Sequence, residues 1–90
     1  MIITTTQSIE GYHIVEYLGI VGAFEEDYQS VGREMDDLED ELRDQAEYKG
    51  ANAIVGFTYI SASTYSDDGY GGNQKPDMIA YGTAVRIEKD

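Results

Sequence analysis

The 90-residue sequence has no cysteine, no tryptophan, one proline and one histidine. The absence of cysteine excludes disulfides, a thiolate metal site and a cysteine nucleophile. No stretch approaches the ~18 consecutive apolar residues of a membrane-spanning helix. The N-terminal MIITTT lacks the basic start and long apolar run of a secretory signal. We therefore expect one small cytoplasmic domain over residues 1–90.

Basic residues are also scarce. The chain has 6 lysines and arginines against 18 aspartates and glutamates, which gives a formal net charge of −12. Nucleic acids and anionic membrane surfaces are bound mainly through clusters of Lys and Arg. We therefore expect neither nucleic acid nor a membrane as a partner.

The stretch 24–50, FEEDYQSVGREMDDLEDELRDQAEYKG, repeats apolar residues every three or four positions, as one stripe of a helix does. These residues are Phe24, Tyr28, Val31, Met35, Leu38, Leu42 and Ala46. The pattern predicts one helix from about residue 25 to 49, with Gly50 in the left-handed position after the last turn. Glu25, Asp27 and Ser30 are alternative starts.

Eleven of the 18 acidic residues fall in this stretch, mostly off the apolar stripe. The simpler interpretation is a solvated outer face that keeps the protein soluble. The alternative is an acidic surface for cations or for a basic partner. No calcium-loop order of carboxylates is present.

Four β-rich segments surround the predicted helix, at residues 2–6, 12–21, 53–63 and 78–88. Their β-branched and aromatic residues favour strands. Gly11 supplies the turn between the first two segments, and the glycine-rich residues 64–76 predict a long loop between the last two. The sequence thus predicts a β-β-α-β-β subunit, an α+β architecture in which one long acidic helix packs on a four-stranded sheet.

Period-two alternation assigns the strand side chains to two faces. For residues 12–21 the pattern places Tyr12, Ile14, Glu16, Leu18 and Ile20 opposite His13, Val15, Tyr17, Gly19 and Val21. For residues 53–63 it places Ala53, Val55, Phe57 and Tyr59 opposite Ile54, Thr58 and Ile60. For residues 78–88 it places bulky Ile79, Tyr81, Thr83, Val85 and Ile87 opposite small Met78, Ala80, Gly82 and Ala84. Both faces are therefore largely apolar.

One helix with one apolar stripe can cover only one face of such a sheet. An apolar sheet face left open on a monomer favours aggregation. Burial of the second face or of the sheet edges by identical chains avoids this exposure. The sequence therefore predicts an obligate homo-oligomer, with the chain itself as its partner.

Five segments resemble a known family. They are IITTT at 2–6, the turn IEG at 9–11, IVEYLGIV at 14–21, KGANAIVGFTY at 49–59 and YGTAVRIE at 81–88. In this order they resemble the YbjQ-like family of small bacterial proteins, which carries a heavy-metal-binding label. The resemblance implies an α+β subunit that assembles into a cyclic ring, a pentamer, with the sheets forming a central wall. Typical members have a longer stretch before their acidic helix, so this chain resembles a shortened member.

Two residues are candidate metal ligands. His13 is the only histidine, and a ring can bring its copies around one axis, although an ordinary strand or edge position is the alternative. Glu16 shares its predicted face with apolar residues, so its carboxylate needs a partner. Arg86, Lys49, backbone amides or a solvated subunit seam can serve, and a functional carboxylate repeated around a ring is the other possibility. Oxygen ligands without thiolates suit a hard divalent cation better than a soft heavy metal.

Thr4 and Thr6 can line a polar pocket or pore with hydroxyls, or can simply favour a strand. Tyr17 and Tyr81 are further interface or pocket candidates. No Ser-His-Asp order stands out and no carboxylate is evident to orient His13, so we do not predict an enzyme. The sequence predicts a homo-oligomeric binding or structural module of unknown activity. A metal-cation-binding protein with sites at subunit interfaces is the second hypothesis, and an enzyme with a site between subunits is the third.

Overall fold

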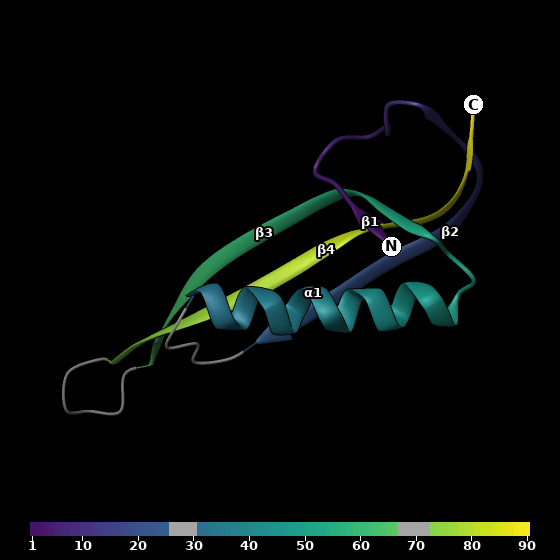
Figure 1. Ribbon diagram of the computed structural model, residues 1–90. Helices are drawn as coiled ribbons and strands as arrows, with labels where there is room; N and C mark the ends of the chain where they lie inside the picture. The colour runs from purple at the N-terminus through teal and green to yellow at the C-terminus, as the bar shows by residue number, and fades with distance from the viewer. Residues whose placement is uncertain (26–30, 67–72) are drawn as a thin grey trace.

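The computed structural model describes residues 1–25, 31–66 and 73–90, and the side chains of residues 1–24, 35–60 and 78–90. Its elements are β1 (Ile2–Ile3), β2 (Tyr12–Glu25), α1 (Val31–Tyr48), β3 (Ala53–Ser66) and β4 (Asn73–Lys89). The strands form one mixed sheet in the order β1-β3-β4-β2, and only the β1–β3 pair is parallel. This arrangement confirms the predicted β-β-α-β-β order and the α+β class (Figure 1).

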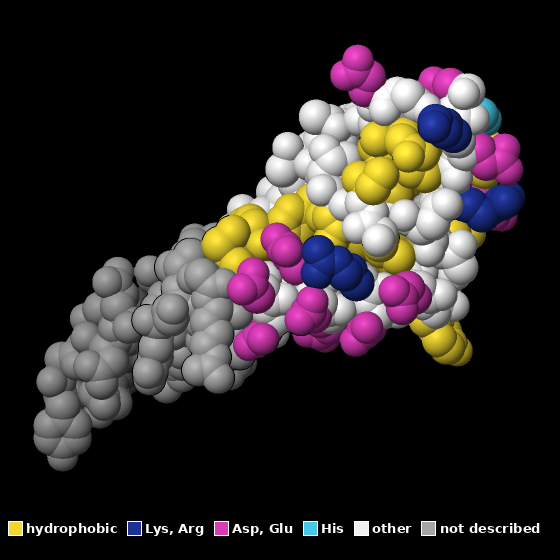
Figure 2. Space-filling view, in the orientation of Figure 1, with side chains coloured by type: hydrophobic (Ala, Val, Ile, Leu, Met, Phe, Trp, Pro, Cys, Tyr) yellow, Lys and Arg dark blue, Asp and Glu magenta, His cyan; other side chains and the backbone are white. Residues whose placement is uncertain are grey.

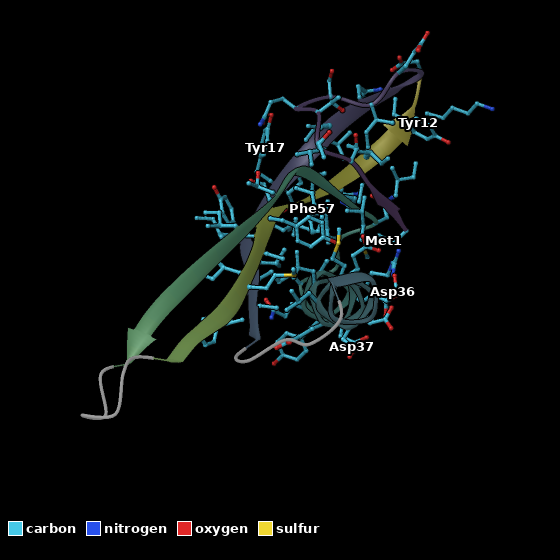
Figure 3. All side chains as sticks on the ribbon, turned by 90° about the vertical axis from the view of Figure 1, so that its left-hand side faces the viewer. Met1, Tyr12, Tyr17, Asp36, Asp37 and Phe57 are labelled. Carbon is cyan, nitrogen blue, oxygen red and sulfur yellow. The ribbon has the colours of Figure 1, made fainter. Side chains whose placement is uncertain are left out.

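Helix α1 lies across one face of the sheet, mainly over β2 and β4 (Figure 1). Leu38, Leu42 and Ala46 are fully buried against the sheet, and Met35 is half-buried. These four residues follow the predicted apolar stripe. In Figure 3 α1 is seen end-on, with Phe57 directed toward it from the sheet. The helix covers this face because its apolar stripe meets the small side chains of β4.

The described helix is shorter than predicted. It has 18 residues, about 27 Å at 1.5 Å per residue. Phe24 and Glu25 lie in β2, so the assignment of Phe24 to the helix stripe and of Glu25 to the helix start is wrong. The alternative starts at Asp27 and Ser30, and the stripe residue Tyr28, lie outside the described residues. Lys49 follows the last helical residue rather than lying within the last turn.

The end of the helix follows its sequence signal. Gly50 has a φ of +84°, the left-handed conformation expected just after a helix. Beyond it, the Ala51 N–H donates to the Ala46 carbonyl at 2.9 Å, which satisfies one of the last helical acceptors. Glycine adopts this φ without strain, so the chain reverses directly into β3.

The predicted faces of β4 are confirmed. Met78, Ala80 and Ala84 are buried in the cluster that contacts α1, whereas Val85 and Ile87 belong to a second cluster on the other face. Alternation holds over this part of β4 because the extra residue at each register shift belongs to β2 or β3, and not to β4.

The predicted faces of β2 are wrong. Its register against β4 shifts between Ile14 and Glu16 and again between Tyr17 and Gly19. Each bulge adds one residue and inverts the alternation that follows it. Ile14, Tyr17 and Ile20 therefore share one face, and Glu16, predicted to lie beside Ile14 and Ile20, lies off that face.

The predicted faces of β3 hold only up to Val55. Gly56 has a φ of +63°, and the register against β4 shifts between Val55 and Thr58. Phe57 and Tyr59 consequently pack on the helix side together with Ile54. Thr58 and Ile60 pair with Tyr81 and Ile79 on the opposite face. A glycine inside a strand is a common mark of such a bulge.

The N-terminal segment is less regular than the strand predicted over 2–6, because β1 contains only Ile2–Ile3. Two further contacts tie the segment to the β3 bulge, where the carbonyls of Thr4 and Thr6 accept hydrogen bonds from Phe57 and Gly56. No helix in the described part of the chain is long and apolar enough to cross a membrane.

Candidate interaction surface

One half of the second sheet face is covered by the chain itself. Ile9 and Ile14 pack there against a small buried cluster. The cluster consists of Ala53, Val55, Val85 and Ile87. The N-terminal segment thus closes this end of the face, near the chain termini. The covered end is a second, smaller core.

The other half of the same face has no helix or segment over it in the described residues. We call this half the uncovered face. It carries the exposed side chains of Tyr17, Ile20, Phe24, Ile60 and Tyr81, with the half-buried Thr58, Ile79 and Thr83 between them. Ile20 is 78% exposed, Tyr17 70% and Phe24 49%. In Figure 3, Tyr17 lies on the side of the sheet away from α1.

Strand pairing places these side chains next to one another. Ile79 of β4 has Phe24 of β2 as its partner on one side and Ile60 of β3 on the other. Thr83 is opposite Ile20, and Tyr81 is opposite Thr58. Residues paired across strands share a face and contact one another. The exposed apolar residues are therefore one contiguous patch and not scattered positions.

The uncovered face differs in charge from the helix side of the molecule. None of the eight residues of the uncovered face is charged. On the helix side, acidic side chains cover the outer surface of α1 (Figure 2), and Asp36 and Asp37 point away from the sheet (Figure 3). Within α1, Arg43 lies 3.0 Å from Asp40 and 3.7 Å from Glu39. The uncovered face is thus the neutral surface of a strongly acidic chain.

Glu16 lies in β2, two residues after Ile14. Its Oε1 is 3.4 Å from Arg86 Nε, one of the partners expected from the sequence. The two residues are paired across β2 and β4, and both side chains are about half exposed. Such an exposed pair contributes about 0–1 kcal/mol. The carboxylate is therefore solvated and paired, and it is not a buried functional acid.

His13 is closer to carboxylates than the sequence indicated. Its Nδ1 lies 2.8 Å from Asp90 Oδ1, and its Nε2 lies 3.9 Å from Glu88 Oε2. The expectation that no carboxylate orients this histidine is therefore wrong. The signal was missed because the two acids are more than 70 positions away in the sequence and reach His13 only through β2–β4 pairing. All three side chains are more than half exposed.

The threonines lie apart from the uncovered face. Thr4 Oγ1 and Thr6 Oγ1 are 2.8 Å apart, and Thr6 Oγ1 also donates to the Ser8 carbonyl at 2.6 Å. These contacts satisfy the hydroxyls locally beside the β3 bulge. No ligand-sized pocket is present in the part of the chain that the structure describes.

Of the sequence candidates, only Tyr17 and Tyr81 lie on the uncovered face. Ile20, Phe24 and Ile60 were not singled out as site residues. The signal for them was the apolar character of both strand faces, but the bulges hid which side each residue takes.

A helix packed on one face of a mixed sheet, with the second face half open, places the chain among small two-layer α+β proteins. The family model described as "Putative heavy-metal-binding" (YbjQ) matches residues 22–88. The chain belongs to this YbjQ family.

Two relatives align with this protein over nearly the whole chain. A UPF0145 protein of Methanocaldococcus jannaschii is 38% identical, over 99% of this chain and 94% of its own length. A UPF0145 protein of Thermotoga maritima is 30% identical, over 99% of each chain. That second alignment spans 112 positions against the 90 residues here, so the Thermotoga protein contains residues that this chain lacks. The name UPF0145 assigns these relatives no activity.

A solved structure shares the fold. It is a protein of unknown function of the DUF74 family from Pediococcus pentosaceus, with a TM-score of 0.74, 21% identity and coverage of 98% of each chain. At this identity the likeness shows the fold alone.

Proposed function

We propose that this protein is a small homo-oligomeric binding or structural module in which the uncovered face is buried against copies of the chain. The observation that carries the proposal is the contiguous apolar patch around Ile20, Phe24 and Tyr81 on a strongly acidic chain. Full burial of a large apolar side chain contributes about 1.5–3 kcal/mol. The free energy gained by burying five such side chains on each copy is comparable with the entropic cost of association, about 4–15 kcal/mol.

The distribution of charge supports identical chains as the partner. Copies with a net charge of −12 repel one another. Contact through the uncovered face brings neutral surfaces together and leaves the acidic outer surface of each α1 in solvent. Membership of the family extends the proposal to a closed ring, which we take to be a pentamer. A cytoplasmic location stays a prediction of the sequence.

Native mass spectrometry tests this proposal with a matched pair of variants. Ile20→Glu places a carboxylate in the centre of the uncovered face, whereas Tyr48→Glu places one on α1, where Tyr48 is 93% exposed. The expected result is a pentamer for the wild type and Tyr48→Glu, and a monomer for Ile20→Glu. A monomeric wild type at micromolar concentration contradicts the proposal.

A metal-cation-binding protein with sites at subunit interfaces is the second candidate. The observation that favours it is His13 beside Asp90 and Glu88, together with the family description. One subunit does not supply a complete site, because no group of three or more His, Cys, Asp or Glu side chains in the described residues can hold a metal ion. The oxygen-rich donors also do not fit a soft heavy metal, which prefers thiolates.

Thermal unfolding separates the two candidates. A metal-binding oligomer gains melting temperature with one divalent cation, loses it with chelator, and loses the response in His13→Ala. A structural oligomer responds to neither. Sodium chloride at matched ionic strength is the control for screening of the acidic helix.

A further inference from the structure

The strand β2 forms one edge of the sheet, and a side chain from α1 occupies that edge. The Gln45 Nε2 donates to the Gly22 carbonyl at 2.7 Å, and the Gly22 N–H donates to Gln45 Oε1 at 3.1 Å. Both backbone groups of Gly22 are thus used by one side-chain amide. A neighbouring strand satisfies the same two groups with one N–H and one C=O. The amide of Gln45 imitates that strand.

The helix holds Gln45 in this position. Leu42 and Ala46, on either side of it along the helix, are fully buried against the sheet, so the backbone of α1 is fixed relative to β2. One turn after Gln45, the Lys49 Nζ lies 3.8 Å from the position that a β-carbon would take at Gly19. Residues four apart share one side of a helix. The side chains of Gln45 in α1 and of Lys49 just after it therefore both extend toward β2, at Gly22 and Gly19.

An unpaired edge strand is a template for pairing with another chain, and native proteins protect such edges. We propose that Gln45 closes the edge of β2 at Gly22 against pairing with a strand from a second copy of this chain. The function of Gln45 is then to exclude an edge contact, so that copies associate through other surfaces.

A second copy of the chain can supply the strand that would pair with the β2 edge, because its β3 edge is long. At the opposite side of the sheet, β1 pairs with β3 only at Ala53 and Ile54, and the last backbone bond between this segment and β3 is from Phe57 N–H to the Thr4 carbonyl. Beyond Phe57, β3 continues to Ser66 with β4 as its only neighbour among the described residues.

Among the described residues, each subunit therefore has an open β3 edge on one side and the β2 edge on the other. Pairing of unlike edges is head-to-tail, and such contacts form an open filament when they do not close into a ring. Gln45 occupies the β2 edge, at which a β3 edge of a second copy would pair to start such a filament.

Hydrogen exchange and sedimentation of the full chain test the proposal together. Gln45→Met keeps the length and helix propensity of the side chain but removes both hydrogen bonds. Tyr48→Ala is the matched control. It is an uncharged change on the same helix, at a side chain that is 93% exposed. In Gln45→Met we expect the Gly22 amide to exchange at least tenfold faster, and the protein to form species that grow without limit as concentration rises. Wild type and Tyr48→Ala should show neither change.

Gln45→Glu provides a second test if Gln45→Met folds poorly. Its carboxylate still accepts from the Gly22 N–H but cannot donate to the Gly22 carbonyl. We expect a protected Gly22 amide and no growth, because the edge stays occupied and charged. Unchanged Gly22 exchange in Gln45→Met overturns the proposal, as does faster exchange without new association. Both readouts are differences from the wild type, so they remain decisive even if the wild type is a monomer and the proposed function fails.

Discussion

The phenol of Tyr59 on β3 donates a hydrogen bond of 3.0 Å to Glu39 Oε1 on α1. It is a direct polar link between the helix and the sheet, beside the edge-to-face contact of the Tyr59 and Phe57 rings, whose centroids are 4.6 Å apart. Burial raises the pKa of Tyr59 well above its ordinary value of 10.0, and the hydrogen bond and negative charge of Glu39 raise it further. The phenol therefore stays protonated in the folded protein when an unfolded tyrosine ionises.

Alkaline unfolding tests this link. Because the folded pKa of Tyr59 is higher than the unfolded one, its contribution to stability is complete below pH ~10 and falls as the pH rises above that value. Tyr59→Phe should lower the free energy of unfolding at pH 7 by about 1 kcal/mol through loss of the hydrogen bond. It should also flatten the fall in stability above pH ~10, the ordinary tyrosine pKa.

Urea denaturation at several pH values provides the measurement. Tyr48→Phe is the control, because Tyr48 is 93% exposed and lies outside the uncovered face. An alkaline stability loss that is the same in Tyr59→Phe and in the wild type would contradict the role of Tyr59.

The close packing around Gly82 predicts that a β-carbon there destabilises the fold, and Gly22 provides a matched glycine for comparison. A β-carbon at Gly82 would lie 2.7 Å from Ile54 Cγ2 and 3.2 Å from the Val55 carbonyl oxygen. One at Gly22 would lie no closer than 3.5 Å to any atom across the sheet. Gly82→Ala should therefore cost about 1–3 kcal/mol by overpacking, and Gly22→Ala should change stability by less than about 0.5 kcal/mol. Equal unfolding free energies of the two variants in urea would show that the β3 bulge yields easily.

Asn52 predicts a loss at the joint between helix and sheet. Its Oδ1 accepts from the Ile87 N–H at 2.7 Å, and its Nδ2 donates to the Ile87 carbonyl at 3.0 Å. The side chain thus continues the β3–β4 ladder one step before β3 begins. Asn52→Ala removes both bonds from a part-buried position and should cost about 1–2 kcal/mol.

Lys49→Ala, three residues earlier on the same joint, is the control for Asn52→Ala and should change stability by less than about 0.5 kcal/mol. Thermal and urea unfolding measure both variants. A neutral Asn52→Ala would mean that water replaces the two bonds without loss.

The order of helix and strands was predicted correctly from the sequence, but the faces of two strands were not, because bulges within those strands change the alternation. Strand β4 follows strict alternation over its predicted residues, and its small side chains face α1 as expected. Strands β2 and β3 contain the register shifts, beside Gly19 and Gly56, whose φ values are +110° and +63°. Glycines inside both strands were visible in the sequence, but alternation alone gives no count of the inserted residues.

The site was predicted in the same uneven way. Two-sided apolar strands indicated an open face before any side chain could be placed, and Tyr17 and Tyr81 do lie on it. The partners of His13 could not be predicted, because they depend on which residue of β4 lies opposite β2. The protection of the β2 edge by Gln45 also depends on a tertiary contact, since nothing in the local sequence aligns Gln45 with Gly22.

The outer surface of α1 predicts that salt stabilises the protein. Acidic residues recur four positions apart there, in the pairs Asp36–Asp40, Asp37–Glu41 and Asp40–Asp44, and like charges at this spacing destabilise a helix by about 0.2–0.5 kcal/mol per pair. Raising sodium chloride from about 20 mM to about 500 mM shortens the Debye length from roughly 20 Å to roughly 4 Å. The melting temperature should therefore rise by several degrees, and choline chloride should give the same rise because the effect is screening and not ion binding. Asp40→Asn, which removes the charge shared by two of these pairs, should reduce the response to salt. A melting temperature that falls with salt would mean instead that the ion pairs of Arg43 outweigh the repulsion around them.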